Sequence, residues 1–500
     1  MREREYLISR YKIIISGIGI ILCLSGALML IPLALLPGNP REWETAWYFL
    51  VTASAQVFFG FILWRFFRPA RSVALSVQEG GIIVLIGWIA VILFSAIPFL
   101  SLEGIDYSRG VFESVSAWTT TGLSVIDVTR ASRMILFWRS LVQLAGGAGL
   151  AIIMMSALTG PSGTGIPNAE GRGDQLVPQV SRSARLVLLI YLSYAAAGTL
   201  AYWAAGMSFF DAINHCFAAI STGGFSTRVE SIGYWDSAAI EAVTIPLMIL
   251  GNLSFVTAWY LWRGRMREVA RNGEVRVMTA VIPIATAAVF FFTSRGLYLQ
   301  LGKAARVAVF EVVSAITTTG YSTVPYTNWN SFGILILIVL MLIGGGTCST
   351  AGGIKQFRIY LMWKYFAWEA KRPLMPRTAV VKHYTWEGNR KAFLDDTKIR
   401  PVFLFILLYM TCYFLGVTVL CASGYSLSDS LFEFASALGT VGLSVGVTSA
   451  RMHNSALWAE IIAMFMGRLE FFVVIVSLVK LVQDTRRMII PTRILSKNTY

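Results

Sequence analysis

Four short segments of this 500-residue chain share a string that could bind a dehydrated cation, Thr-x-Gly-[Leu/Phe/Tyr]-Ser. Backbone carbonyl oxygens can replace the hydration water of a cation without adding a formal charge. Aiming successive carbonyls at one point requires unusual backbone dihedrals, which a glycine in each string permits. The residues predicted to form the four cation-binding loops are Thr120, Thr121, Gly122, Leu123, Thr222, Gly223, Gly224, Phe225, Thr318, Thr319, Gly320, Tyr321, Thr440, Val441, Gly442 and Leu443.

An ionisable residue stands at the same distance before each string, at Glu113, His215, Glu311 and Glu433. A carboxylate at this place could attract cations to the outer mouth of a pore. The alternative, which we favour, is that these residues hold short helices in place through hydrogen bonds. We expect a structural role for His215 too, because no other histidine lies near it in the sequence. Small residues at membrane helix contacts would explain one string, but not four in matching contexts.

The composition predicts that membrane helices position these loops. Hydrophobic residues make up 56% of the chain and charged residues 14%, whereas soluble proteins carry about 25% charged residues. Uncharged runs of about 20 residues, the length that crosses a bilayer, recur along the chain. The five cysteines are scattered and suggest neither a disulfide framework nor a zinc site. The ten predicted spans are Ile13–Leu36, Ala46–Trp64, Gly80–Leu102, Ser140–Leu158, Leu186–Ala205, Ala242–Trp262, Val277–Ser294, Ser331–Ile354, Pro401–Ala422 and Ala456–Leu481.

Each string lies between two spans, which predicts a repeating unit of span, short re-entrant helix, loop and span. Non-helical backbone at membrane depth is tolerated where it lines a water-filled path, so four such loops on one axis would make a pore. The predicted fold class is an all-α integral membrane protein with ten transmembrane helices: four pore repeats around a pseudo-fourfold axis and two extra N-terminal helices. The predicted divisions are residues 1–72 (the N-terminal pair), 73–172, 173–272, 273–400 (the third repeat with a basic cytoplasmic segment) and 401–500 (the fourth repeat and tail).

Most of the 42 Lys and Arg residues fall on one side of the predicted spans. The N-terminus, the segment Lys355–Arg400 and the C-terminal tail all belong to this basic side. Cytoplasmic loops of membrane proteins carry such an excess, so both termini are predicted to be cytoplasmic. The net charge of +15 is then explained by topology and by contact with lipid headgroups, and nucleic acid is not a predicted partner.

These features resemble the Trk/Ktr/HKT superfamily of potassium-translocating subunits, and the two extra N-terminal spans resemble its bacterial TrkH/TrkG branch. The resemblance rests on the four strings, on the glycine-rich stretch Gly344–Lys355 and on Gly467-Arg468-Leu469-Glu470. Potassium-channel filters read Thr-Val-Gly-Tyr-Gly, which the fourth string matches best. The resemblance implies potassium as the substrate, a selectivity filter and an inner-membrane location. In some plant relatives a serine replaces the first filter glycine and accompanies sodium transport, whereas all four positions here are glycine.

The glycine-rich stretch cannot form a stable straight helix, because each glycine costs about 1 kcal/mol relative to alanine. The residues alone leave two interpretations equally open, a hinge or close helix packing on small side chains. The resemblance implies an intramembrane loop below the filter that acts as a gate. The predicted gate residues are Gly344, Gly345, Gly346, Thr347, Cys348, Ser349, Thr350, Ala351, Gly352 and Gly353.

Arg468 lies within an apolar span, where an ionisable residue is a candidate functional site. One interpretation is a structural ion pair with another repeat, although Glu470 is a poor partner because it is only two residues away on a helix. The other is a fixed positive charge below the filter that slows cations. The resemblance implies the second, a barrier in the permeation path.

The segment Lys355–Arg400 is rich in basic and aromatic residues. It is predicted either to lie on anionic lipid or to dock a cytosolic regulator. The resemblance implies a ring of RCK-type, TrkA-like nucleotide-binding subunits as that regulator, and a homodimer with one pore in each protomer. The chain has neither a G-x-G-x-x-G fingerprint nor a Walker A motif, so no cofactor is predicted here and any nucleotide would bind the partner subunit.

The sequence suggests two alternatives to a gated potassium pore, a coupled symporter and a membrane-embedded enzyme. A sodium- or proton-coupled potassium symporter on the same fold stays open, since one sequence does not separate a channel from a carrier. A membrane-embedded enzyme is not supported, because the sequence has no HExxH motif, nucleophile elbow or Cys/His cluster.

Overall fold

The computed structural model describes residues 2–38, 42–68, 75–148, 180–347, 349–375, 384–387, 390–393 and 396–489. Contacts divide the chain into two compact units, residues 1–103, 150–186 and 469–500, and residues 104–149 and 187–468. Helix α8, Val180–Ala204, begins in the first unit and lies mostly in the second. All the predicted filter and gate residues belong to the second unit.

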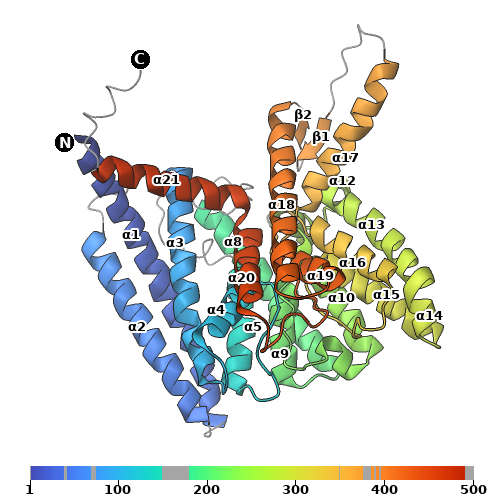
Figure 1. The fold of residues 1–500 in the computed structure, drawn as a ribbon, viewed down its shortest axis with the longest axis horizontal. Coiled ribbons are helices and arrows are strands. Elements are labelled where there is room, and N and C mark those ends of the chain that lie inside the picture. The colour runs from blue at the N-terminus through green and yellow to red at the C-terminus, as the bar shows by residue number, and fades with distance from the viewer. Residues whose placement is uncertain are drawn as a thin grey trace. The chain divides into compact units, whose positions relative to one another are not determined.

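The first unit contains three long apolar helices, α1, α2 and α3, that lie side by side in Figure 1, and α21 crosses one end of them. Helices α1 and α2 pack closely, since a side chain at Gly19 would overlap the backbone of Gly60. Ser76 caps α3 in a capping box, and Glu79 of the same turn forms a buried ion pair with Arg10 of α1. The elements are α1 Arg2–Met29, η1 Ile31–Gly38, α2 Trp43–Phe67, α3 Val77–Ser95, η3 Ile97–Ser101 and α21 Phe471–Ile489.

The second unit contains four short helices, α4, α9, α15 and α19, and each ends where one of the four strings begins. Three of them have 12 residues, about 18 Å of helix, which is too short to cross a hydrocarbon core of about 30 Å. Side chains of Asp106, Ser208 and Ser426 cap the N-termini of α4, α9 and α19. These four lie where the sequence predicts short helices before the strings, and their re-entry into the membrane stays a prediction.

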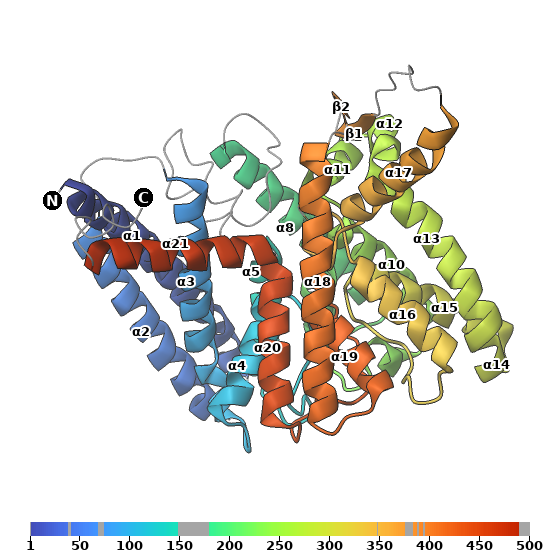
Figure 2. The same cartoon turned by 45° about the horizontal axis from the view of Figure 1, so that its top comes forward.

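Longer helices of the second unit pack against the short ones, as Figure 2 shows for α10, α13 and α16 around α15. The elements of the second unit are α4 Tyr107–Trp118, α5 Arg133–Ala148, α9 Phe209–Ile220, η4 Ser231–Trp235, α10 Ala238–Asn252, α11 Phe255–Trp262, α12 Met266–Arg271, α13 Gly273–Val289, the π-helical η5 Phe290–Ser294, α14 Arg295–Leu297, α15 Leu301–Ile316, α16 Ser331–Ile343, α17 Gln356–Lys371, η6 Arg372–Leu374, α18 Asp396–Ala422, α19 Leu427–Leu438 and α20 Asn454–Leu469. A short antiparallel hairpin, β1 Tyr384–Glu387 and β2 Arg390–Phe393, interrupts the otherwise helical chain.

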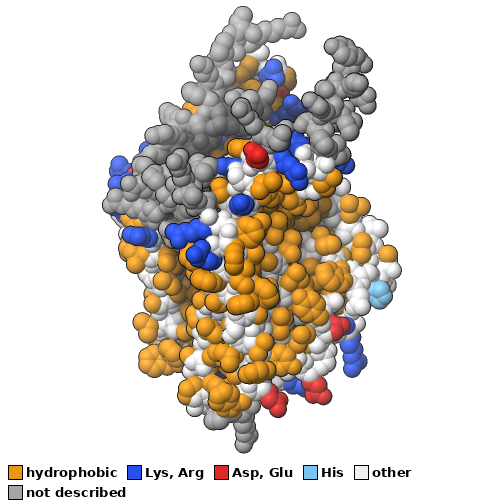
Figure 3. Space-filling model, turned by 90° about the vertical axis from the view of Figure 1, so that its left-hand side faces the viewer, with side chains coloured by type: hydrophobic (Ala, Val, Ile, Leu, Met, Phe, Trp, Pro, Cys, Tyr) orange, Lys and Arg blue, Asp and Glu red, His pale blue; other side chains and the backbone are white. Residues whose placement is uncertain are grey.

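Within the described ranges, six helical stretches are long and apolar enough to cross a membrane, or eight if two bent pairs each count as one span. All eight coincide with predicted spans, and the predicted span Ser140–Leu158 falls partly outside the described residues. The face drawn in Figure 3 is largely hydrophobic, with Lys and Arg side chains gathered near one end. The protein is therefore a multi-pass membrane protein.

Two spans predicted as continuous are broken, and a third, Ser331–Ile354, unwinds at the glycine-rich stretch, where the sequence predicts no stable straight helix. Ala242–Trp262 turns by 119° between α10 and α11, because Leu253 is extended and Ser254 caps a new helix. Ser331–Ile354 ends as a helix at Ile343, where Gly344 has a φ of +67°. Ala456–Leu481 is interrupted at Glu470, which has a φ of +62°. Hydrophobicity reveals membrane depth, but it does not reveal where hydrogen bonds to other segments replace those of a helix.

Candidate functional site

The four strings adopt one backbone geometry. The first threonine of each has a positive φ, between +50° and +55° at Thr120, Thr222, Thr318 and Thr440. The glycine two residues later also has a positive φ, between +68° and +100° in the four copies. Glycine adopts this region readily, whereas threonine does so at a cost, typically 1–3 kcal/mol. The sequence signalled the glycines but not the strained threonines.

The four loops form a closed ring. A side chain at Gly122 would overlap the carbonyl oxygen of Gly223 in the second loop, and one at Gly224 would overlap that of Thr319 in the third. The third loop contacts the fourth in the same way, through Gly320 and the carbonyl of Val441. Gly442 closes the ring against the carbonyl of Thr121 in the first loop. Because each contact joins backbone to backbone, none of the four glycines has room for a side chain.

One side chain in each short helix is hydrogen-bonded to the loop that follows. These residues are Glu113, His215, Glu311 and Glu433. All four are fully buried. Glu113 accepts hydrogen bonds from Ser124 Oγ at 2.7 Å and from the backbone nitrogen of Val125 at 2.6 Å. The other three have the corresponding contacts: Glu433 with Ser444 Oγ at 2.6 Å, His215 Nε2 with Ser226 Oγ at 2.9 Å, and Glu311 with the nitrogen of Thr323 at 2.8 Å. The structure thus gives these residues the hydrogen-bonding role that we favoured over cation attraction.

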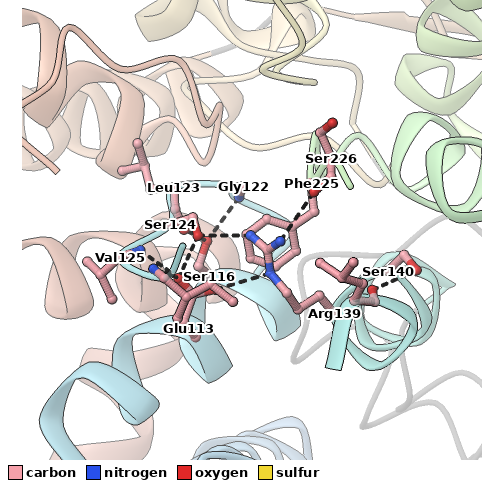
Figure 4. Close-up of polar contacts among 12 residues, drawn as sticks. Glu113, Ser116, Gly122, Leu123, Ser124, Val125, Arg139, Ser140, Phe225 and Ser226 are labelled. Atoms are coloured by element: carbon pink, nitrogen blue, oxygen red, sulfur yellow. Dashed lines mark hydrogen bonds and ion pairs between the residues drawn. The ribbon is translucent and has the colours of Figure 1, made fainter. Parts of the chain in front are cut away.

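Arg139 of α5 is a component that the sequence reasoning missed. Its side chain is 2% exposed, and its Nε lies 3.3 Å from Glu113 Oε2 (Figure 4). Its Nη2 donates to Ser124 Oγ at 2.9 Å and its Nη1 to the carbonyl of Ser226 at 3.3 Å. It therefore bridges the first and second loops. Arg139 directly precedes the predicted span Ser140–Leu158, and this position gives no sign of burial.

We expect Arg139→Leu to destabilise the protein strongly, since breaking a buried ion pair leaves a buried charge and costs about 3–5 kcal/mol. The measurement is the melting temperature of the detergent-purified protein. A matched control is Arg130→Leu, because Arg130 pairs with Asp127 at 3.6 Å on the surface, where a pair contributes about 0–1 kcal/mol. Equal melting temperatures for the two variants would contradict the bridging role.

The predicted gate segment is a non-helical loop. Its tip contacts the first threonine of each of the four strings. Thr350 Oγ1 lies 3.0 Å from Thr222 Oγ1, and Thr120 Oγ1 donates to the carbonyl of Thr350 at 3.3 Å. The nitrogen of Gly352 donates to Thr318 Oγ1 at 3.1 Å. A side chain on Gly352 would overlap Thr440 Oγ1, so the tip contacts the threonine of every loop. Cys348, the remaining predicted gate residue, lies outside the described residues.

Polar groups of α10 and α13 hold the base of this loop. The nitrogen of Gly346 donates to Asn252 Oδ1 at 3.0 Å, and that of Thr347 donates to Glu274 Oε1 at 2.6 Å. The nitrogen of Gly345 donates to the carbonyl of Gly352 at 3.0 Å, so the two ends of the loop lie together. Asn252 and Glu274 stand at the ends of helices and belong neither to the four strings nor to the glycine-rich stretch, and the sequence reasoning did not select them as site residues.

Arg468, in the last turn of α20, bonds to the same loop. Its Nη1 donates to the carbonyl of Thr350, and its Nη2 donates to the carbonyl of Gly146 in α5 at 2.8 Å. The guanidinium thus joins the tip of the loop to α5. These contacts place Arg468 against the loop whose tip meets the four strings, and they stabilise this conformation of the loop.

A closed ring of four backbone loops in a multi-pass membrane protein is typical of cation transporters. A family model described as "TrkH: Cation transport protein" matches residues 54–487, and the chain belongs to this family. The predicted resemblance is thereby confirmed.

Curated relatives and a solved structure agree with this assignment. The chain is 31% identical to an uncharacterized cation transporter from Methanocaldococcus jannaschii, over 88% of this chain and 90% of the relative. It is 31% identical to the Trk system potassium uptake protein TrkH of Escherichia coli K12, over 85% of this chain and 90% of that protein. The crystal structure of the potassium transporter TrkH from Vibrio parahaemolyticus matches with a TM-score of 0.81 and 29% identity, over 93% of this chain and 98% of that one.

Proposed function

We propose that this protein takes up potassium through the ring of four loops and that residues 344–353 form its gate. The observation that carries the proposal is the closed ring, in which each filter glycine packs against a carbonyl of the next loop. Rings of backbone carbonyls replace the hydration shell of potassium in known filters. Two similar proteins are named for potassium uptake and potassium transport, which supports potassium as the ion.

The test is ion flux into liposomes that contain the purified protein. Potassium and its analogue rubidium should enter faster than sodium, and resolved unitary currents in a planar bilayer should accompany the flux. Equal rates for potassium and sodium would overturn the proposed filter. Strict coupling of potassium entry to sodium or proton entry would show a symporter on the same fold.

In the proposed mechanism, the conformation described here is closed. The tip of the loop at Thr350 and Gly352 contacts the threonines on one side of the filter, where a permeating cation would have to pass. The contacts that hold it are a few hydrogen bonds, each with a net contribution of about 0.5–1.5 kcal/mol. A partner that prefers the open state by a few kcal/mol would therefore displace the loop.

We propose that this partner is a cytosolic RCK-type nucleotide-binding subunit, that the protein is a homodimer in the cell inner membrane, and that both termini are cytoplasmic. The family relatives that belong to a Trk system support a multi-subunit assembly. Within α17, Trp363 and Phe366 are about two-thirds exposed, and the basic side chains of Lys364 and of Arg372, which begins η6, lie over aromatic rings. This basic and aromatic surface suits contact with the partner or with anionic headgroups.

Arg468→Ala is expected to raise potassium flux by about tenfold without the partner. The substitution removes a positive charge below the filter and frees the carbonyl of Thr350, and tenfold corresponds to about 1.4 kcal/mol, within reach of one hydrogen bond to a charged group. Flux per folded protein is the measurement. Arg468→Lys separates the two effects, since lysine keeps the charge but not the forked geometry. Normal folding with unaltered flux in Arg468→Ala would count against the barrier.

A further inference from the structure

In three of the four repeats, a serine hydroxyl of the short helix is hydrogen-bonded to the backbone of its filter loop. The second repeat has no such serine. Ser116 Oγ donates to the carbonyl of Leu123 at 2.6 Å and accepts from the nitrogen of Gly122 at 3.0 Å. Ser314 Oγ donates to the carbonyl of Tyr321 at 2.5 Å, and Ser436 Oγ accepts from the nitrogen of Gly442 at 3.0 Å. The matching position of the second repeat is Ala218, which has no hydroxyl.

Gln143 of α5, in the first repeat, supplies hydrogen bonds to the second loop instead. The side chain is fully buried. Its Nε2 donates to the carbonyl of Gly223 at 2.6 Å, and its Oε1 accepts from the nitrogen of Phe225 at 3.2 Å. The two bonds straddle Gly224, the filter glycine of this loop. One amide therefore fixes the backbone on both sides of the position that contacts the third loop.

The second repeat differs from the others at one more position, and the difference fits Gln143. The residue between threonine and glycine is Thr121, Thr319 or Val441 in the other loops, but Gly223 in the second. A side chain at Gly223 would overlap the amide group of Gln143. Gln143 thus takes the place of the missing serine in holding the strained loop, and the extra glycine leaves room for its amide group.

Other contacts to this loop come from the same face of α5. Arg139, one turn before Gln143, places its guanidinium 3.9 Å from the ring centroid of Phe225 (Figure 4). On the opposite side, Tyr321 Oη of the third repeat donates to the carbonyl of Phe225 in the loop at 3.4 Å and to that of His215 in α9 at 2.8 Å. The second loop keeps backbone bonds to its own short helix, from the nitrogens of Gly223 and Gly224 to the carbonyl of Ala218, but neighbouring repeats supply the side-chain bonds that a serine of the short helix supplies in the other three loops.

We propose that Gln143 is a positioning residue that sets ion selectivity by fixing the carbonyl of Gly223 and the backbone of Gly224. This inference rests on the proposed function of the four loops as a potassium filter. The carbonyl of Gly223 is the oxygen against which Gly122 of the first loop packs. Without the amide, the second loop has neither a serine nor a glutamine to hold it. The position of the Gly223 carbonyl is then no longer fixed against the first loop.

The test compares the potassium-to-sodium flux ratio of Gln143→Ala with that of the double variant Gln143→Ala/Ala218→Ser. The single variant should lower the ratio by about three- to tenfold, the effect of losing one or two buried hydrogen bonds. The double variant restores the hydroxyl that the other loops use, and it should recover part of the lost selectivity. Gln143→Met, which keeps the volume, provides a second single variant in case the alanine variant does not fold.

A matched control is Gln56→Ala, because Gln56 is also fully buried and its amide bonds to Ser25 Oγ at 3.5 Å in the first unit, which contributes none of the four loops. Its ion preference should equal that of the parent protein. If folded Gln143 variants keep the parent ratio, or if Ala218→Ser restores nothing, Gln143 is packing alone and the inference is wrong. The filter itself would then still be judged separately, by its glycine variants.

Discussion

Replacing Gly320 by serine should cost this protein most of its preference for potassium over sodium, a fall of at least about tenfold. Two physical effects combine at this position. Gly320 has a φ of +78°, which an L side chain adopts with strain, and a Cβ there would overlap the carbonyl oxygen of Val441. The third loop must therefore move away from the fourth, and a displacement that costs only about 1.4 kcal/mol in relative ion binding changes selectivity tenfold. Rubidium and sodium uptake into cells without other potassium systems measures the effect.

Gly424→Ser is the matched control for this prediction. Gly424 has a φ of +97°, so serine meets similar backbone strain, but no atom lies within 4 Å of the added Cβ. Its ion preference should stay that of the parent protein. Gly122→Ser should behave like Gly320→Ser, because Gly122 contacts the second loop in the same way. An unchanged ion preference in both filter variants would refute the assignment of these loops as the filter.

Deleting Thr347–Ala351 should leave the pore open without its partner, with potassium flux at least about tenfold above that of the parent protein. The deletion removes Thr350, whose side chain and carbonyl contact the threonines of the first two loops. The remaining ends are compatible with rejoining, since the nitrogen of Gly345 and the carbonyl of Gly352 are 3.0 Å apart. Losing several hydrogen bonds of about 0.5–1.5 kcal/mol each is enough for such a shift.

The measurement is flux into liposomes in the absence of any partner, normalised to folded protein. The potassium-to-sodium ratio should persist, because the deletion leaves the four filter loops intact. Thr350→Val is a milder companion variant that keeps the branched side chain but removes the hydroxyl, and it should raise flux by less. A folded deletion variant that conducts no more than its parent would mean that residues 344–353 are packing and not a gate.

Much of the site was predictable from local pattern. Runs of apolar residues predict which segments lie in the membrane. The four strings are recognisable because each repeats the same short context around a glycine. Unwinding near Gly344 was predictable for the same local reason, since clustered glycines destabilise a helix whatever surrounds them. These properties depend on residue type and spacing, and both are visible in the sequence.

The order of the loops and the residues that brace them were decided only by the tertiary structure. The ring closes because Gly442 packs against Thr121, a contact between distant parts of the chain that no periodicity encodes. Arg139 resembled the charged flank of a span and Gln143 a polar residue within one, until their partners in the second loop gave each a role. The breaks at Leu253 and Glu470 were not predicted, because each lies in a run that is apolar enough on average to form one continuous span. The physical reason is the same in each case: a buried polar group is stabilised by its partner, and the partner is set by packing between segments rather than by neighbours in the sequence.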